Sequence, residues 1–97
     1  MIFKQKIIEE RQEILEIATK HGVFNLRLFG SVAREEETAE SDIDLLIDYD
    51  LKKISPWFPT GLIRDLQDLL GRKIDVVTEK GLNPRVRENV IKDCIPL

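Results

Sequence analysis

The chain has 97 residues, enough for one domain spanning residues 1–97, and its 42% hydrophobic and 34% charged residues exclude a disordered polypeptide. A formal net charge of −3 argues against a protein whose main task is to grip duplex DNA, so direct nucleic-acid binding is not expected. The single cysteine excludes an internal disulfide and favours the reducing cytoplasm, and no apolar run approaches the roughly 20 residues of a membrane span.

The first third of the chain carries the pattern of a helix followed by a strand. Apolar side chains recur at helical spacing through residues 3–20, which predicts an amphipathic helix. Residues 25–29, NLRLF, predict a short strand, which the pair Gly30-Ser31 interrupts. Residues 32–37, VAREEE, can then form one or two helical turns.

The middle of the chain predicts a second strand, a loop and an amphipathic helix. Residues 42–49, DIDLLIDY, have the β-branched and aliphatic content of a strand. The loop that follows contains Trp57 and Phe58, which either fill the edge of the core or form part of a partner surface. Residues 60–71 place Leu and Ile side chains on one helical face, with Thr60 as the candidate N-cap.

The last quarter predicts a third strand, a final helix and an apolar tail. Residues 73–78, KIDVVT, have a strand pattern, and Asn83-Pro84 is a good N-cap and first-turn pair for a helix. The tail at 94–97 would be a docking strand or simply the boundary of the sequence. The element order α-β-α-β-α-β-α predicts an α+β fold, an α/β sandwich in which helices cover a small β-sheet.

Two acidic residues alternate with aliphatic ones at the start of the second predicted strand. On a strand, Ile43 and Leu45 share one face, and Asp42 and Asp44 share the other, about 7 Å apart at a rise near 3.3 Å per residue. Neighbouring carboxylates repel each other, and partial burial adds to that penalty. A divalent cation such as Mg²⁺, which prefers hard oxygen ligands, relieves both penalties. The alternative is a solvated strand edge with no chemical role.

Asp75 is a third acid inside an apolar strand. It lies between Ile74 and Val76. If its strand neighbours the strand of Asp42 and Asp44, the three carboxylates converge on one face. Three carboxylates suit one or two metal ions that clamp a phosphoryl transfer, and Asp75 can also take the proton of an attacking hydroxyl.

The strand-to-helix junction fits a phosphate group. Gly30 permits the backbone to approach a ligand closely, and backbone N–H groups together with the Ser31 hydroxyl form an anion site. The alternative is that Ser31 only caps the turn that follows it. Phosphate donors on one side and metal-binding carboxylates on the other define a site for a nucleoside triphosphate.

The motif FGSVAR, followed by SDIDLL and then by an isolated Asp in a later apolar strand, resembles the minimal nucleotidyltransferases of the DNA-polymerase-beta-like superfamily. The resemblance spans nearly the whole chain and implies a small mixed sheet with flanking helices. It implies that Gly30 and Ser31 bind the β- and γ-phosphates of ATP. It also implies that Asp42 and Asp44 bind Mg²⁺, and that Asp75 completes the metal site or acts as the base.

The reaction implied by the resemblance is transfer of AMP from ATP to a hydroxyl, with release of pyrophosphate. Such minimal proteins are often antitoxins that pair with a helical HEPN-domain toxin, a ribonuclease, and add AMP to one of its tyrosines. A chain of 97 residues has no room for a separate acceptor-binding domain, so we expect a second protein to supply the acceptor. Two alternatives stay open: an antitoxin that masks the toxin by binding alone, and transfer to a small molecule or nucleic acid.

Arg34 and Glu35 follow the Gly-Ser motif. Arg34 is expected to contact the nucleotide or a partner, or to pair with a neighbouring Glu. Family members commonly have Gly where this chain has Glu35, and Gly there would ease the exit from the short helix. Glu35 would weaken nucleotide binding if it faced the phosphates, and it would cost little if it faced solvent.

Overall fold

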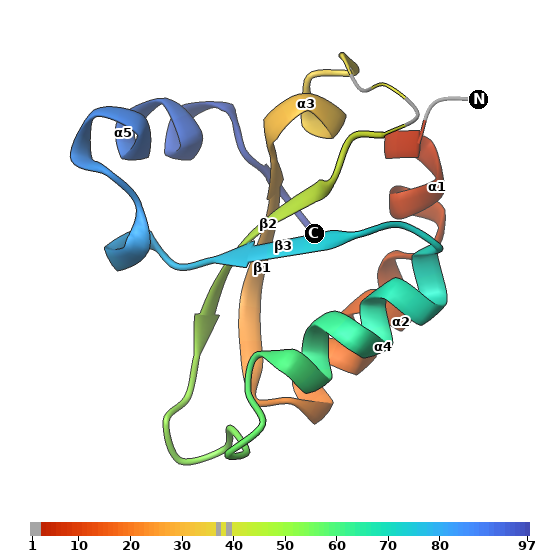
Figure 1. The fold of residues 1–97 in the computed structure, drawn as a ribbon, viewed down its shortest axis with the longest axis vertical. Helices are drawn as coiled ribbons and strands as arrows, with labels where there is room; N and C mark the ends of the chain where they lie inside the picture. The colour runs from red at the N-terminus through yellow and green to blue at the C-terminus, as the bar shows by residue number, and fades with distance from the viewer. Residues whose placement is uncertain (1–2, 37, 39) are drawn as a thin grey trace.

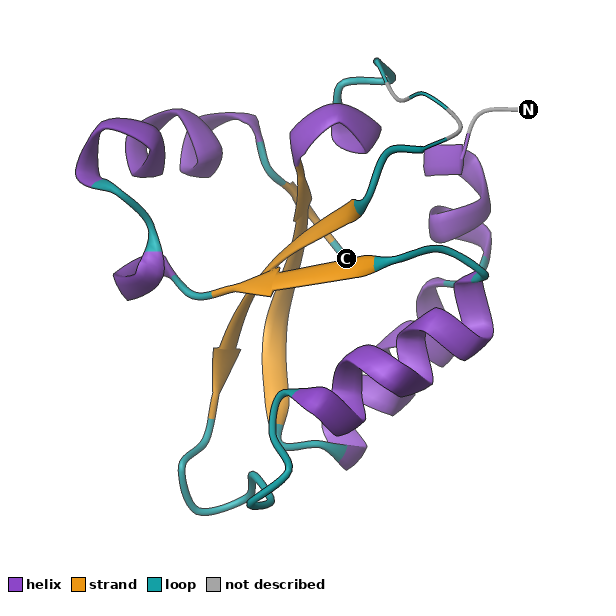
Figure 2. Ribbon diagram, in the orientation of Figure 1, coloured by secondary structure: helices purple, strands orange, loops and turns teal. Residues whose placement is uncertain are grey.

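The computed structural model describes residues 3–36, 38 and 40–97. Figure 1 shows the elements in chain order, and Figure 2 separates helices from strands. The elements are α1 (Phe3–Glu9), α2 (Arg11–Lys20), β1 (Val23–Phe29), α3 (Gly30–Ala33), β2 (Ile43–Tyr49), α4 (Thr60–Leu70), β3 (Ile74–Val77), the 3-10 turn η1 (Glu79–Gly81), α5 (Pro84–Asp93) and β4 (Ile95–Pro96). Within the described ranges, no helix combines the length and the apolarity that crossing a membrane requires.

The described strands form one mixed sheet in the order β3-β2-β1-β4. Strand β2 runs antiparallel to β1 and parallel to β3, while β4 runs antiparallel to β1. Helix α4 connects the parallel pair, because parallel neighbours need a crossover long enough to return the chain to the same end of the sheet. The predicted α+β fold, a small mixed sheet flanked by helices, is confirmed.

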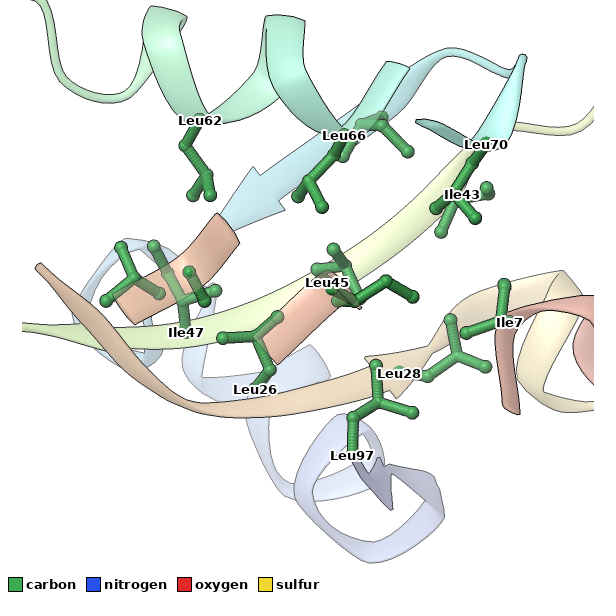
Figure 3. Close-up of a cluster of buried hydrophobic side chains, with 14 of the residues drawn as sticks. Ile7, Leu26, Leu28, Ile43, Leu45, Ile47, Leu62, Leu66, Leu70 and Leu97 are labelled. Atoms are coloured by element: carbon green, nitrogen blue, oxygen red, sulfur yellow. The ribbon is translucent and has the colours of Figure 1, made fainter. Parts of the chain in front are cut away.

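Helices α1, α2 and α4 lie together on one side of the sheet, and α5 lies on the other side (Figure 1). The alternation in β2 turns Ile43, Leu45 and Ile47 into the layer of three helices, where all three are buried. Figure 3 shows them among buried side chains from the facing elements, including Leu62, Leu66 and Leu70 of α4. Burying one such side chain contributes about 1.5–3 kcal/mol, so this contact holds α4 on the sheet.

The first predicted helix is divided into two. Helix α1 ends at Glu9 and α2 begins at Arg11, with a turn at Glu10. Ile7 of α1 and Ile14 of α2 are both buried, so the division leaves the predicted apolar stripe facing the sheet. The last predicted helix is also less embedded than its pattern indicated, because Val90 is the one residue of α5 that is buried.

One predicted helix cap is wrong by one position, and one is confirmed. Thr60 is the first residue of α4, and the cap position belongs to Pro59, which makes no side-chain hydrogen bond there. The alternative role of Ser31, as the cap of the turn that follows it, is not observed, because Ser31 lies inside α3. Asn83 is confirmed as the cap of α5, since its side-chain oxygen accepts a hydrogen bond from the amide of Arg85 at 2.9 Å. Short polar residues near a helix start mark the region of the boundary but not its register.

The apolar tail docks on the sheet of its own chain. It forms β4 beside β1, and the amide of Leu97 donates a hydrogen bond to the carbonyl of Leu26 at 2.9 Å. The Nε atom of Arg11 donates to the carbonyl of Leu97 at 3.0 Å. One edge of the sheet is therefore partly covered, while β3 forms the opposite edge.

Candidate active site

Asp44 and Asp75 are brought together by the register of the parallel pair. Their Cα atoms are partners across β2 and β3. Side chains at paired positions point to the same face of a sheet. This face is opposite the layer of three helices, because Ile43 and Leu45, on either side of Asp44, are buried in that layer. The two strands are therefore neighbours with both acids on one face, which meets the condition that the sequence set for Asp44 and Asp75 to share a face.

Asp42 lies one residue before β2, at the same end of the strand as Asp44. One of its carboxylate oxygens is 3.7 Å from Nζ of Lys73, which precedes β3. Within the described ranges, no three His, Cys, Asp or Glu side chains stand close enough together to enclose a metal ion as they lie. A cation shared by Asp42, Asp44 and Asp75 would therefore compete with Lys73 for the Asp42 carboxylate.

The three carboxylates nevertheless interact electrostatically. The pKa of Asp44 is raised from 3.8 to about 6, mainly by burial and then by the negative charges of Asp75 and Asp42, while the positive charge of Arg34 acts in the opposite direction. The shift means that the negative charge at Asp44 is poorly compensated by the protein itself. A bound divalent cation would supply the missing positive charge, and carboxylate oxygens are the ligands that Mg²⁺ prefers. The chemistry of these three carboxylates therefore suits Mg²⁺, although the side chains as they lie in the described ranges do not enclose an ion.

Gly30 lies directly against Asp44. Strand residue Phe29 is the register partner of Asp44, and the chain turns into α3 at the next residue. Gly30 has φ +78°, a conformation that favours glycine, and a Cβ atom placed on it would collide with the Asp44 carboxylate. Glycine is therefore required here both for the turn and for the room that Asp44 occupies. The Gly-Ser turn and the acidic cluster are parts of one site.

Ser31 is the second residue of the short helix α3, and Arg34 is the residue after its end. Ser31 is half-buried, and its carbonyl accepts a hydrogen bond from the amide of Glu36 at 2.8 Å. Arg34 follows the last residue of α3, and its Nε donates to the carboxylate of Glu36 at 3.1 Å. Of the alternatives that the sequence left open for Arg34, pairing with a neighbouring Glu is thus observed. Its charge still lowers the pKa of Asp44, so it remains part of the electrostatics of the site.

Glu35 adopts the left-handed conformation that a glycine would favour. Its φ is +59°, which explains physically why Gly would ease the exit from the short helix. Its carboxylate is half-exposed and lies 3.7 Å from Nζ of Lys4 in α1. Glu35 therefore pairs with the N-terminal helix.

Sequence reasoning missed Arg27, a buried cation on the face that carries Asp44. It is only 8% exposed, and it lies two residues before Phe29, so its side chain is directed to the same face. Arg27 forms ion pairs with Asp48 at 3.3 Å and with Glu79 at 2.8 Å, and Glu79 also pairs with Arg87 at 3.5 Å. This network ties β1, β2, η1 and α5 together on that face. The available signal was a single Arg alternating with leucines in NLRLF.

The acidic cluster is open to solvent on one side. Asp75 is exposed, and Asp42 is partly exposed. A hollow of about 410 Å³ lies at the other end of β2, with Tyr49, Leu51 and Thr78 in its wall, and includes none of the three acids. An open arrangement of this kind leaves room for a nucleotide and for an acceptor carried by another molecule.

The aromatic pair in the loop after β2 is divided between the two roles that the sequence allowed. Phe58 packs against the core, and its ring lies 5.1 Å from that of Tyr49. Trp57 is 78% exposed and contributes nothing to the core. Of the two alternatives, filling the edge of the core therefore applies to Phe58 and does not apply to Trp57.

Comparison with known proteins gives relatives that match over almost the whole chain. The family model described as "Nucleotidyltransferase domain" matches residues 5–97. A candidate protein adenylyltransferase of Methanocaldococcus jannaschii, MJ0126, is 40% identical over 93% of this chain and 97% of the relative. The protein adenylyltransferase MntA of Thermococcus cleftensis is 30% identical over 91% of this chain and 93% of the relative.

Solved structures match the fold as well. A protein described as a minimal nucleotidyltransferase superposes with a TM-score of 0.82 at 37% identity, covering 97% of this chain and 95% of the other. A toxin-antitoxin structure with AMP-PNP has a chain that superposes with a TM-score of 0.69 at 17% identity, covering 88% of this chain and 69% of that one, which shows a shared fold. Given the match along residues 5–97 and the mixed sheet, the chain belongs to the nucleotidyltransferase domain family, as an enzyme of its minimal nucleotidyltransferase group.

Proposed function

We propose that this chain transfers AMP from ATP to a hydroxyl of a partner protein, with Mg²⁺ as cofactor, and that it acts in the cytoplasm as the antitoxin of a toxin-antitoxin pair. The observation that carries the proposal is the pairing of Asp44 with Asp75 beside Gly30, where a Cβ atom would collide with the Asp44 carboxylate. This pairing joins a triphosphate-binding turn to metal-binding carboxylates on one open face.

The proposed roles follow from the chemistry of each group. Asp42, Asp44 and Asp75 would hold one or two Mg²⁺ ions, which would neutralise phosphate charge when bound. The backbone at Gly30 and the hydroxyl of Ser31 would hold the β- and γ-phosphates. Asp75, the exposed member of the three acids, would also accept the proton of the attacking hydroxyl.

The acceptor is proposed to be a tyrosine of a helical HEPN-domain ribonuclease toxin, which would bind this chain as a hetero-oligomer. Two curated relatives carry the words protein adenylyltransferase in their names, and a chain of the same fold occurs in a toxin-antitoxin structure with AMP-PNP. The open acidic cluster supports an acceptor that another protein brings to the site.

The test is a transfer assay with the purified chain and a purified helical HEPN-domain protein, chosen as the product of a neighbouring gene. With ATP and Mg²⁺, the partner should gain the mass of one or more AMP groups, and chelation of Mg²⁺ should stop the gain. Asp44→Asn should abolish transfer, whereas Asp68→Asn, an exposed position on α4, should leave transfer unchanged.

Two outcomes would contradict the proposal. Neutralisation of the toxin that survives Asp44→Asn, with no added mass in the wild type, would indicate an antitoxin that only masks its partner. Transfer to a small molecule or a nucleic acid in the absence of any partner protein would identify a different acceptor class.

A further inference from the structure

Strand β3 is an open edge of the sheet, and it carries one of the three acids. Among the described strands it pairs with β2 alone, and it packs mainly against β2 and α4. The opposite edge is partly covered by β4. An uncovered edge strand presents backbone N–H and C=O groups to any extended chain that approaches it.

The direction of the β3 peptide groups follows from one hydrogen bond. The amide of Ile43 donates to the carbonyl of Lys73 at 2.9 Å, so the Lys73 carbonyl points to β2. Peptide groups alternate in direction along a strand, so the N–H and C=O groups of Ile74 and Val76 point away from β2. Within the described part of the chain, no other strand pairs with this edge. We call these outward groups of Ile74 and Val76 the β3 edge.

The side chains alternate as well, and this places Asp75 where an incoming residue would meet it. Asp75 is exposed and shares a face with Asp44. Because its own peptide groups face β2, a residue opposite Asp75 on an added antiparallel strand would form a non-hydrogen-bonded pair, with Cα atoms about 4.5 Å apart. The side chain of that residue would lie on the same face as the acids.

We propose that the β3 edge receives an extended segment of the partner protein as an added strand, and that the hydroxyl-bearing residue opposite Asp75 is the AMP acceptor. This inference rests on the proposed function. The hydroxyl oxygen forms a bond to the α-phosphorus of ATP, the bond from that phosphorus to the bridging oxygen breaks, and pyrophosphate leaves with the electron pair. The hydroxyl proton passes to the Asp75 carboxylate.

A polypeptide is the occupant that the β3 edge fits. Donors and acceptors that alternate along an extended backbone match the groups of another extended backbone, and this pairing is how edge strands bind peptides. Neither a nucleic acid nor a small alcohol offers that repeating pattern of N–H and C=O groups.

Amide hydrogen exchange followed by NMR tests the inference directly, because it resolves single residues. The probe is the purified partner protein, added without ATP. The amides of Ile74 and Val76 should exchange at least tenfold more slowly in the complex, whereas the amide of Val77, which faces β2, should change little. Equal exchange of Ile74 and Val76 in the free and bound chain would overturn the inference. Slowing that rises with the concentration of this chain alone would identify a second copy as the occupant and would overturn it too.

A pair of variants at Val76 separates the effect of losing the backbone N–H group from the effect of losing the valine side chain. Val76→Pro removes one outward N–H group, which an edge strand tolerates on its solvent side, while Val76→Ala keeps that group. We expect Val76→Pro to raise the KM for the partner at least tenfold compared with Val76→Ala, with the thermal shift induced by ATP and Mg²⁺ unchanged. An equal KM for both variants would contradict the inference.

The two proposals can fail separately. If the wild-type chain transfers no AMP, the proposed function fails, and the exchange pattern of Ile74 and Val76 still decides whether a partner strand binds at the β3 edge. If Val76→Pro does not fold, the exchange measurement on the wild-type chain decides alone.

Discussion

Gly30 and Asp44 constrain each other, and this mutual constraint is the sharpest feature of the site at the scale of single residues. The backbone turns at φ +78°, and the Asp44 carboxylate fills the space that a Cβ atom of residue 30 would need. Gly71 is the natural comparison, since it has a similar φ of +69° and no described atom lies within 4 Å of a Cβ atom built on it. A comparison of the two glycines therefore separates the effect of a positive φ, which both share, from the effect of steric contact with Asp44, which only Gly30 has.

Gly30→Ala should therefore be more harmful than Gly71→Ala. The left-handed conformation penalises both variants by roughly 1–2 kcal/mol. Gly30→Ala must also displace Asp44, so we expect a larger loss in the free energy of unfolding and at least a tenfold loss of AMP transfer. Urea denaturation and the transfer assay measure both quantities. Equal losses in the two variants would contradict the steric role of Gly30.

Glu35→Gly should stabilise the protein. A non-glycine residue at φ +59° is strained by roughly 1–2 kcal/mol, and the ion pair with Lys4 is exposed and worth about 0–1 kcal/mol. We expect relief of the strain to raise the free energy of unfolding by about 1 kcal/mol. Loss of the ion pair with Lys4 reduces this gain by whatever that pair contributes. Lys4→Ala measures the ion pair alone. A loss of stability in Glu35→Gly larger than the loss in Lys4→Ala would show that the conformation is not strained.

At the scale of elements, α4 connects the two strands that carry Asp44 and Asp75. Its side chains Leu62, Leu66 and Leu70 pack against the sheet, and all three are fully buried. The parallel register of β2 and β3 depends on this crossover, because it holds β3 beside β2. The site geometry therefore rests on an apolar contact on the opposite face of the sheet.

Leu66→Ala should cost about 2–5 kcal/mol of the free energy of unfolding, because it removes a buried side chain and leaves a cavity. Asp68→Ala, on the exposed side of the same helix, should change it by less than about 0.5 kcal/mol. Chemical denaturation of the two variants provides the comparison. A small effect of Leu66→Ala would mean that α4 is not anchored through this face.

At the scale of the whole molecule, the acidic cluster couples stability to pH. The pKa of Asp44 is raised from 3.8 to about 6 in the folded chain, so the folded state binds more protons than the unfolded state between these values. The contribution of Asp44 to the free energy of unfolding is therefore present at low pH and is lost as the pH rises through about 6. The pKa of Asp65 is lowered, mainly by its hydrogen bond with His21. The contribution of Asp65 to the free energy of unfolding is therefore lost as the pH falls, which is the opposite trend to that of Asp44.

Asp44→Asn isolates this effect, since it leaves Asp65 in place. Without divalent cations, the stability of Asp44→Asn relative to wild type should increase as the pH rises from 4 to 7 and then level off. Millimolar Mg²⁺ at pH 7 should reduce the difference by stabilising the wild type alone. Thermal unfolding across pH, with and without Mg²⁺, measures both trends. A difference that stays constant with pH would contradict the raised pKa of Asp44.

Local patterns in the sequence were sufficient to predict the main helices and strands and to predict which face of β2 is buried. The alternation at residues 42–49 predicted which side of β2 is buried, because side chains on a strand alternate between two environments. Asn83 predicted the start of α5, since a short polar side chain followed by Pro defines a cap locally. The predicted cap at Thr60, which lacks such a pair, was wrong by one position, because local chemistry does not set the register of a helix by itself.

The sequence by itself determined the α+β class, the strand that carries Asp44 with Asp42 just before it, and the separate strand of Asp75, because these depend on periodicity and composition along the chain. Only the tertiary structure decided that Asp44 and Asp75 are register partners, that Gly30 makes room for a carboxylate, and that Arg27 is buried in an ion-pair network. Those facts depend on which strands lie side by side and in what register. Hydrogen bonding and packing between residues far apart in the sequence set that arrangement, and no local pattern encodes it.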